Sequence, residues 1–468
     1  MTNSLYKQLF FHLHNNWQWY VAILCVIIYL LIIIFTFNTG YGWDESIYLL
    51  HTDIFSGRQS DFNEFNFRPI LFSIVLMPFY NLSSNLIFLR IIMILFSIFI
   101  LILLFFLLKK LFGSKIAILL VSFFCLSPIF VGTSQYILTD IIVLLFVVPG
   151  VYFAYKYFCE SKRTDLLFSS IFFGFAFLTR FFYGSFLLLL LLFMLFKYRS
   201  IKQFIIDLFF AFVPFLVIIF PYLLFSKYLF GGFLTTLKVG QILVSFYDNP
   251  WYVYFSYFFE YWQLLFLAAI IGIYFLYKRK EDHKTRFFFA FLILFIIQLV
   301  YFCLTPHKEP MYAIPLAFDI LFLAGFGITN WVNSYSAKTK KIIIKLCLII
   351  ILIIIIFALY FFATKYISFE NNVSQNMLPI NYLKDTNFVG TIYTNTDVPQ
   401  YIYLFPNNKI VNIYWYNLND KNYEGLFIDN GVLVTNIWAK PLDLNFLNGK
   451  ISILKEFSPY VLYDVNVK

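Results

Sequence analysis

The stretch SSNLIFLRIIMILFSIFILILLFFLLKK, residues 83–110, decides the class of fold. Nearly every residue from Leu86 to Leu108 is apolar, and two lysines, Lys109 and Lys110, follow at once. About 20 apolar residues in helical conformation are enough to cross the roughly 30 Å hydrocarbon core of a bilayer. The stretch therefore predicts a membrane-spanning helix over residues 83–108.

The rest of the chain has the same character. Its 468 residues are 62% hydrophobic and only 12% charged, and the mean hydropathy is +0.81. A soluble fold of this length needs far more polar surface. We expect an all-α polytopic membrane protein with about eleven transmembrane helices, at residues 17–38, 83–108, 116–134, 138–158, 166–180, 181–197, 204–226, 256–277, 287–304, 312–332 and 342–363.

The net charge of +10 reflects the orientation of the chain in the membrane and does not indicate nucleic-acid binding. Clusters of Lys and Arg fall on alternate loops between the apolar runs, and such clusters mark the cytoplasmic side. This bias predicts a cytoplasmic N-terminus and an extracytoplasmic C-terminus. Merging the short spans 166–180 and 181–197 into one helix would spoil the alternation at every later loop, so we predict two spans with a break around Arg180 and Gly184.

The composition changes after the last apolar run. Residues 366–468 are rich in Asn and Asp and contain short alternating segments such as GTIYTNT (390–396), KIVNIYW (409–415) and GVLVTNIW (431–438). Alternation of this kind predicts β-strands. We expect two domains, a transmembrane domain over 1–365 and a small extracytoplasmic α/β domain over 366–468.

Three acids stand at predicted outer ends of spans. Asp44 and Glu45 lie in GYGWDESIYLL (40–50), and Asp140 lies in QYILTDIIVLL (135–145). A carboxylate at a membrane exit can act as a general base, and one next to an apolar run is costly unless it is paired or functional. The alternatives are solvated loop charges for the first two and a helix-start acid for Asp140. Neighbouring helical residues diverge by about 100°, so one of Asp44 and Glu45 faces a site.

Two arginines are candidates for binding an anion. Arg68 precedes Pro69 in FRPILFSIVLMPFY (67–80), a pattern that predicts a helix starting at Pro69 and lying along the membrane surface. A re-entrant packing element is the alternative. Arg180, in FLTRFFYGS (177–185), is either a snorkelling cation or a partner for Asp140 or a lipid phosphate.

The segment TPHKEPMY (305–312) is the densest polar cluster, with His307, Lys308 and Glu309 in succession between two spans. A loop this short holds its cations at the height of the phosphate headgroups, where they can stabilise charge on a phosphate oxygen. An ordinary polar turn is the alternative. The chain lacks a CxxC pair, and a lone histidine is a weak metal signal. The sequence thus indicates no cofactor, and a divalent metal on His307 is left as an open alternative.

Taken in order, WDES (43–46), RPILFSIVLMP (68–78), LTD (138–140) and FGFAFLTRFFYG (173–184) resemble the polytopic GT-C glycosyltransferases. Those are the protein O-mannosyltransferases, the aminoarabinose lipid A transferases and their prokaryotic relatives. The segment HKEPMYAIPLAF (307–318) is similar to the HKExRF or KxxRYxxPxxP loop of related lipid-linked mannosyltransferases, and the soluble tail also matches the prokaryotic members.

The resemblance implies inverting transfer of a sugar, mannose or similar, from a polyprenyl-phosphate donor to a hydroxyl of a lipid, glycan or protein acceptor at the outer membrane face. It implies a prokaryotic plasma membrane, or the ER membrane in a eukaryote, with membrane lipids as partners. Asp44 would activate the acceptor hydroxyl, Glu45 would support it, and Asp140 would orient the acceptor or the base. The residues implied near the donor phosphate are Arg180, His307, Lys308 and, as a further cation, Arg68, with Glu309 and Tyr312 in support.

One departure and two alternatives accompany this reading. Met311 stands where the family has an arginine before the aromatic Tyr312, which shifts the cationic role to Lys308, Arg180 or Arg68. A flippase for a lipid-linked glycan would place its charges at the bilayer midplane. An outer-face glycan polymerase or ligase would share the donor and the topology. No Gly-rich phosphate-binding loop occurs on the inner side, which favours a donor without a nucleotide.

Overall fold

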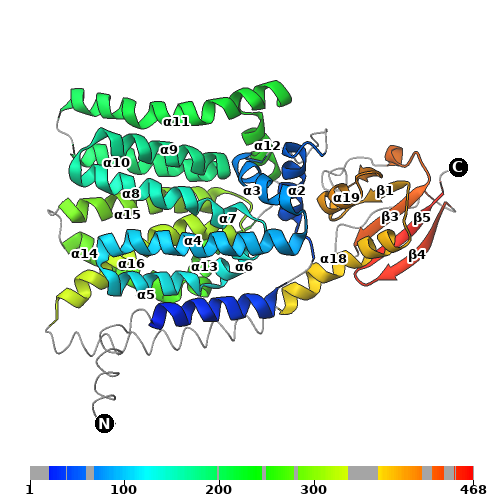
Figure 1. Ribbon diagram of the computed structural model, residues 1–468, viewed down its shortest axis with the longest axis horizontal. Helices are drawn as coiled ribbons and strands as arrows, with labels where there is room; N and C mark the ends of the chain where they lie inside the picture. Colours follow the sequence, from blue (N-terminus) through cyan, green and yellow to red (C-terminus); the bar gives the residue numbers. More distant parts are fainter. Residues whose placement is uncertain are drawn as a thin grey trace, which may run out of the picture. The chain divides into compact units, whose positions relative to one another are not determined.

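The computed structural model describes residues 20–37, 40–58, 68–197, 200–244, 249–278, 283–335, 367–413, 424–436, 447 and 450–466 (Figure 1). They fall into two compact units. The first, which is helical, comprises the described residues of Met1–Phe35, Phe67–Phe72 and Arg90–Phe362. The second comprises the described residues of Thr36–Asn66, Ser73–Leu89 and Ala363–Lys468, and it holds a β-sheet.

The helices that lie wholly or mainly in the first unit follow the apolar runs of the sequence. They are Tyr20–Thr36, α4 (Leu86–Phe112), α5 (Ser114–Cys125), α6 (Pro128–Ser134), α7 (Thr139–Ile142), α8 (Leu144–Glu160), α9 (Arg163–Thr179), η1 (Phe181–Phe186), α10 (Leu187–Lys197), α11 (Ile201–Phe230), α12 (Thr235–Val244), α13 (Val253–Tyr261), α14 (Gln263–Lys278), α15 (His283–Leu304), η2 (Pro310–Ala313) and α16 (Ile314–Asn333).

Among the described residues, five helices are long and apolar enough to cross a membrane, and the number rises to seven if each of two bent pairs is one span. The chain is therefore a multi-pass integral membrane protein, as predicted. Every predicted span before residue 333 contains a helix or a helix pair. The predicted span 342–363 lies outside the described residues, so the total of about eleven stays a prediction.

Two predicted spans differ from straight helices. Residues 116–134 form α5 and α6, which meet at 65°, because Ser127 caps α6 and Pro128 begins it. Residues 256–277 form parts of α13 and α14, which meet at 108° at Trp262. Trp262 leaves the helical conformation, with φ −134° and ψ 26°, so α13 is a separate half-helix.

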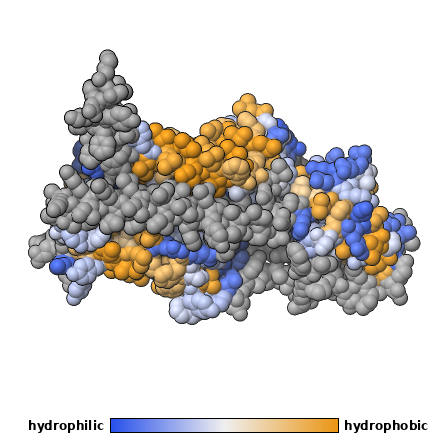
Figure 2. Space-filling view, turned by 90° about the horizontal axis from the view of Figure 1, so that it is seen from below, coloured by the Kyte–Doolittle hydropathy of each residue, from blue (hydrophilic) through white to orange (hydrophobic). Residues whose placement is uncertain are grey.

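The long helix α4 has an apolar side chain on every face. Its exposed residues Ile91, Leu95, Phe99, Ile102 and Phe106 recur at three- and four-residue intervals, and each is 47–58% exposed. Such a stripe is unfavourable in water but suits contact with lipid tails. Figure 2 shows a broad apolar surface over the helical part of the chain.

The chain breaks at Arg180, as the sequence predicted. Helix α9 ends at Thr179, Arg180 adopts an extended conformation with φ −156° and ψ 115°, and η1 and α10 follow. Helix α9 packs between α8 and α11. Arg180 therefore lies between the end of α9 and the start of η1, outside both helices.

Helices α14 and α16 approach each other backbone to backbone. A Cβ atom added at Gly272 would lie 2.1 Å from the carbonyl oxygen of Leu323, and one added at Gly327 would lie 2.4 Å from the carbonyl oxygen of Ala268. These distances are shorter than any non-bonded contact between carbon and oxygen. The contact therefore depends on glycine at both positions.

The second unit contains a five-stranded mixed sheet in the order β2-β1-β3-β5-β4 (Figure 1). The strands are β1 (Thr391–Thr394), β2 (Lys409–Asn412), β3 (Gly431–Asn436), β4 (Ile451–Phe457) and β5 (Tyr460–Val465). Strand β1 pairs in parallel with β2 and β3, and β5 pairs antiparallel with β3 and β4. The three alternating segments quoted from the sequence are β1, β2 and β3, which confirms the small C-terminal sheet.

Strands β1 and β3, at the centre of this sheet, are buried on both faces. Alternate residues of β1 and β3 point to opposite sides, so Ile392 and Val432 join one apolar cluster while Tyr393 and Leu433 join another. The first cluster includes Ile380 of α18 (Ile367–Asp385) and residues of α19 (Val398–Leu404). A strand buried on both faces explains why β3 reads as a nearly continuous apolar run.

The second unit also takes in the first loop of the chain. Ile47 of α2 (Trp43–Phe55) packs on Val398 of α19. The Tyr80 hydroxyl, near the end of α3 (Leu71–Leu82), lies 3.2 Å from the Tyr403 hydroxyl of α19. The predicted domain boundary at 365/366 lies outside the described residues, and the compact unit around the sheet is larger than residues 366–468.

Candidate functional site

Arg180 forms an ion pair with Asp140 in the first unit. Asp140 lies in the first turn of α7 and is 1% exposed. The Arg180 guanidinium also donates a hydrogen bond to the Thr139 hydroxyl, over 3.2 Å. The sequence raised this pairing because a carboxylate beside an apolar run needs a partner. The pair joins the N-terminal end of the α7–α8 span to the break after α9.

The aromatic ring of Tyr312 brings the segment 305–312 to the same place. The Arg180 guanidinium carbon lies 4.9 Å from the centre of that ring, within the range of a cation–π contact. The His307 ring lies 5.5 Å from it, edge to face. The Tyr312 ring therefore contacts both the Arg180 guanidinium and the His307 imidazole.

Glu309 completes this group of charges. Its Oε1 accepts a hydrogen bond from Nε2 of His307 over 2.9 Å. Burial acts to raise the pKa of the Glu309 carboxyl, but the hydrogen bond from His307 and the charges of His307, Arg180 and Arg68 outweigh it, so its pKa is lowered. We call this group the outer cluster, because the distribution of Lys and Arg predicts this end of the α7–α8 span to be extracytoplasmic; it consists of Arg68, Asp140, Arg180, His307, Glu309 and Tyr312.

Lys308 lies beside the outer cluster but is committed to the backbone. It is 5% exposed, and its ammonium donates to the carbonyl oxygens of Asn249, at 2.9 Å, and Thr305, at 2.6 Å. Its backbone N–H donates to the side-chain oxygen of Asn249 over 3.1 Å. Lys308 thus fastens the segment that carries His307 and Glu309 to Asn249, in the segment that precedes α13.

Asp44 and Glu45 belong to the second unit, in the first turn of α2. Glu45 is 1% exposed, and its Oε2 accepts a hydrogen bond from the backbone N–H of Gly42 over 3.1 Å. This is the reach-back half of a capping box, which fixes the start of a helix. Asp44 is half-buried. The two acids therefore differ in role: the Glu45 carboxylate caps α2, and Asp44 projects from another side of the helix.

Arg90 is a buried cation to which the sequence reading gave no role. It is 1% exposed, and its guanidinium lies 4.8 Å from the centre of the Tyr136 ring, just before α7. The sequence does carry a signal, because a charged residue inside an apolar run marks a functional or paired group. Asn249 also contributes, and nothing in its surroundings in the sequence indicates that role.

No group of three or more His, Cys, Asp or Glu side chains suited to a metal ion occurs in the part of the chain that the structure describes. His307 has Glu309 as its carboxylate neighbour, and Arg180 and Arg68 act on the same carboxylate. Cations in these positions disfavour a further cation and favour an anion. The two arginines equal the two carboxylates in formal charge, so the outer cluster can present guanidinium and imidazole donors to a polar ligand without a net negative charge.

Comparison with known proteins shows the family of the chain. The sequence model of the Alg9-like mannosyltransferase family matches residues 3–411. No curated protein matches the chain.

Two solved structures share the fold of the chain over nearly its whole length. One is ArnT from Cupriavidus metallidurans in the apo state, with 13% identity and a TM-score of 0.63. The other is the same protein bound to undecaprenyl phosphate, with 12% identity and a TM-score of 0.66. Each alignment covers 94% of this chain and 97% of that one.

Proposed function

The chain belongs to the Alg9-like mannosyltransferase family of glycosyltransferases, and we propose that it moves a sugar, mannose or similar, from a polyprenyl-phosphate donor to an acceptor hydroxyl with inversion at the anomeric carbon. The acceptor is a lipid, a glycan or a protein. The reaction takes place at the outer face of the membrane, with the N-terminus in the cytoplasm and the C-terminal sheet outside.

The observation that carries the proposal is the outer cluster. It gathers Arg180, Arg68 and His307 from three distant parts of the chain around two carboxylates. It stands at an end of the membrane-length span Thr139–Glu160, where the phosphate of a lipid-linked donor would lie. The likeness to ArnT, which has been solved with undecaprenyl phosphate, supports a lipid phosphate as the group that is bound.

The chemistry is a single displacement. The acceptor oxygen forms a bond to the anomeric carbon while the bond from that carbon to the phosphate oxygen breaks, and the bonding electrons leave with the phosphate. Asp44 takes the proton of the acceptor hydroxyl. General base catalysis of this kind increases the reaction rate by about 10²–10⁴-fold. The departing lipid phosphate gains negative charge, and preorganised cations stabilise that charge. Removing one such donor lowers kcat by about 10²–10³-fold.

The remaining residues support these two tasks. In this proposal Arg180 contacts the phosphate, and Asp140 orients its guanidinium as the buried partner. His307 adds a donor that Glu309 holds in place, and Tyr312 provides the surface against which both rest. Lys308 acts through the loop that it fastens, and Glu45 acts through the start of α2.

The decisive experiment uses purified protein in liposomes with polyprenyl-phosphate mannose and polyprenyl-phosphate glucose as separate donors. We expect one of them to yield free polyprenyl phosphate when a hydroxyl acceptor is present, measured by mass spectrometry of the lipid fraction. The Asp44→Asn variant should release none above background. Release at the wild-type rate by that variant would remove the base from the proposal.

The same assay separates the alternatives. A flippase would move the donor between leaflets without releasing lipid phosphate, and a polymerase or ligase would give products that carry more than one added sugar from a glycan donor. One sugar added for each lipid phosphate released supports the glycosyltransferase.

A further inference from the structure

A second polar constellation lies at the other end of the helical unit from the outer cluster. The span Thr139–Glu160 has 22 residues, a length of roughly 33 Å at 1.5 Å per residue. Asp140 and Glu160 therefore lie at opposite ends of a helix that is long enough to cross a membrane. The distribution of Lys and Arg predicts the Glu160 end to be cytoplasmic.

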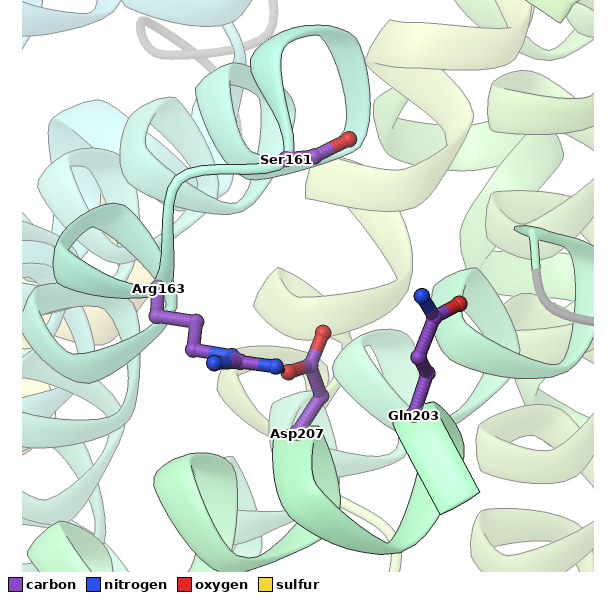
Figure 3. A pocket seen from close by; sticks show the side chains of 4 residues that line it. All are labelled: Ser161, Arg163, Gln203 and Asp207. Carbon is purple, nitrogen blue, oxygen red and sulfur yellow. Dashed lines mark hydrogen bonds and ion pairs between the residues drawn. The ribbon is translucent and has the colours of Figure 1, made fainter. Parts of the chain in front are cut away.

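A cavity of about 540 Å³ is present at this end, where α8, α9 and α11 meet. We call it the inner pocket; it is lined by Ser161, Arg163, Gln203 and Asp207. Figure 3 shows Arg163 and Asp207 pointing toward each other and the Gln203 amide projecting one turn away on α11. Since all four lining residues have polar side chains, the pocket suits a polar ligand.

The acid in the inner pocket is already neutralised. Asp207 is 1% exposed, its Oδ1 accepts a hydrogen bond from Nε of Arg163 over 2.8 Å, and its Oδ2 accepts one from the Tyr157 hydroxyl over 2.6 Å. The Arg163 side chain is 46% exposed. Asp207 therefore orients a guanidinium that still reaches the surface of the cavity, and a guanidinium carries more donors than one carboxylate oxygen uses.

The surroundings of the inner pocket are positively charged. Three ion pairs cancel within themselves: Lys156 with Asp165, Lys162 with Glu160, and Arg163 with Asp207. Lys197 adds positive charge beyond these pairs. The Lys197 ammonium donates to the carbonyl oxygen of Tyr157 over 2.9 Å and lies 4.3 Å from the centre of its ring. The excess of cations favours an anionic ligand.

We propose that the inner pocket binds the phosphate of an anionic phospholipid headgroup in the cytoplasmic leaflet. The Arg163 guanidinium, the Gln203 amide and the Ser161 hydroxyl are the donors. Helix α11 continues from Gln203 with exposed apolar residues, Ile205 at 58% and Phe209 at 62%, which suit acyl chains. Polar donors at a helix end followed by an apolar surface match a whole lipid better than a free phosphate ion.

The test uses purified protein in detergent, with short-chain phosphatidylglycerol, short-chain phosphatidylcholine and inorganic phosphate as separate probes. Binding is measured by native mass spectrometry and by the shift in melting temperature. The two variants each change the net charge by the same amount. Gln203→Glu places a negative charge in the lining of the pocket, and Lys202→Gln removes a positive charge from the neighbouring residue, which does not line it.

We expect phosphatidylglycerol to bind the wild type, Gln203→Glu to weaken that binding by about tenfold or more, and Lys202→Gln to leave it within about twofold; tenfold corresponds to about 1.4 kcal/mol. Phosphatidylcholine should bind more weakly, and inorganic phosphate should compete only at much higher concentration. Equal binding of both lipids, an equal loss in both variants, or binding of inorganic phosphate as tight as that of phosphatidylglycerol would overturn the proposal.

Discussion

Nε2 of His307 lies 2.9 Å from Oε1 of Glu309, and the two residues stand on either side of Lys308 in a segment turned by Pro306 and Pro310. An ionised carboxylate oxygen can only accept a hydrogen bond, so Nε2 is the ring nitrogen that carries the donated proton. His307 thereby has one ring nitrogen engaged and a defined orientation, which is what a group that stabilises a phosphate needs.

This relationship predicts how stability depends on pH. The pKa of Glu309 is lowered from its usual value of 4.5, so its contribution to stability is complete above that value and is lost as the pH falls through the lowered pKa. We expect the melting temperature of the wild type to fall more steeply than that of Glu309→Gln as the pH is lowered below 4.5. Parallel curves for the two proteins would contradict the lowered pKa.

Substitutions of the two neighbouring acids of α2 should have different effects, one on activity and the other on stability. Asp44→Asn should lower kcat/KM by about 10²–10⁴-fold and should lower the melting temperature less than Glu45→Ala does, because it removes a base and leaves the hydrogen bond of the cap in place. Glu45→Ala should cost about 0.5–2 kcal/mol of stability, because the Gly42 N–H loses its acceptor. Steady-state kinetics and thermal unfolding of both variants check this, and a loss of stability in Asp44→Asn alone would reverse the assignment.

The pairing of Arg180 with Asp140 can be measured by a double-mutant cycle. Arg180→Gln should cost about 3–5 kcal/mol, because it leaves the buried Asp140 carboxylate without its opposite charge. Asp140→Asn should cost less, because the Arg180 side chain is partly exposed and keeps its contact with Tyr312. The double variant should cost less than the sum, with a coupling energy of about 0.5–3 kcal/mol. Additive losses would mean that the two side chains do not act as a pair. The KM for the donor should rise with the loss of Arg180 even where the protein is folded.

The buried carboxyl group of Asp319 leads us to expect that an apolar substitution at this position stabilises the protein. It is 0% exposed in α16, and neither carboxyl oxygen has a hydrogen-bond partner among the described residues. A buried polar group without a partner costs about 1–3 kcal/mol. Asp319→Leu, which has the same branching, should therefore raise the free energy of unfolding by about that amount, and Asp319→Asn should change it little. A loss of stability in the leucine variant would mean that the carboxyl has a partner.

The membrane-spanning layout could be predicted from the sequence because apolar runs of sufficient length have few other stable conformations. The break at Arg180 was also predictable, since the charge on the following loop fixes the number of crossings. The bend after α5 carries a signal that the prediction of a straight span did not use, because Ser127 and Pro128 form a helix-start pair. The bend after α13 lies between Glu260 and Gln263, and these residues do not by themselves specify a break in the helix.

In the candidate site, too, some contacts could be predicted from the sequence and others could not. The partner of Asp140 could be inferred, because a buried carboxylate limits the choices to the few cations at the same depth. The role of Lys308 could not, because its acceptors are backbone carbonyls, which every residue has. The packing of α2 on α19 was equally hidden, since Ile47 and Val398 are far apart in the chain and each belongs to an ordinary apolar pattern.

The contact between Gly272 and Gly327 has a consequence for the history of this sequence. Neither position can accept even a methyl group without separating two helices, one of which follows directly on the segment of His307 and Tyr312. Random mutagenesis with selection for transfer should therefore find two intolerant codons that do not belong to the outer cluster. A set of descendants of this chain would keep glycine there while the lipid-facing side chains drift.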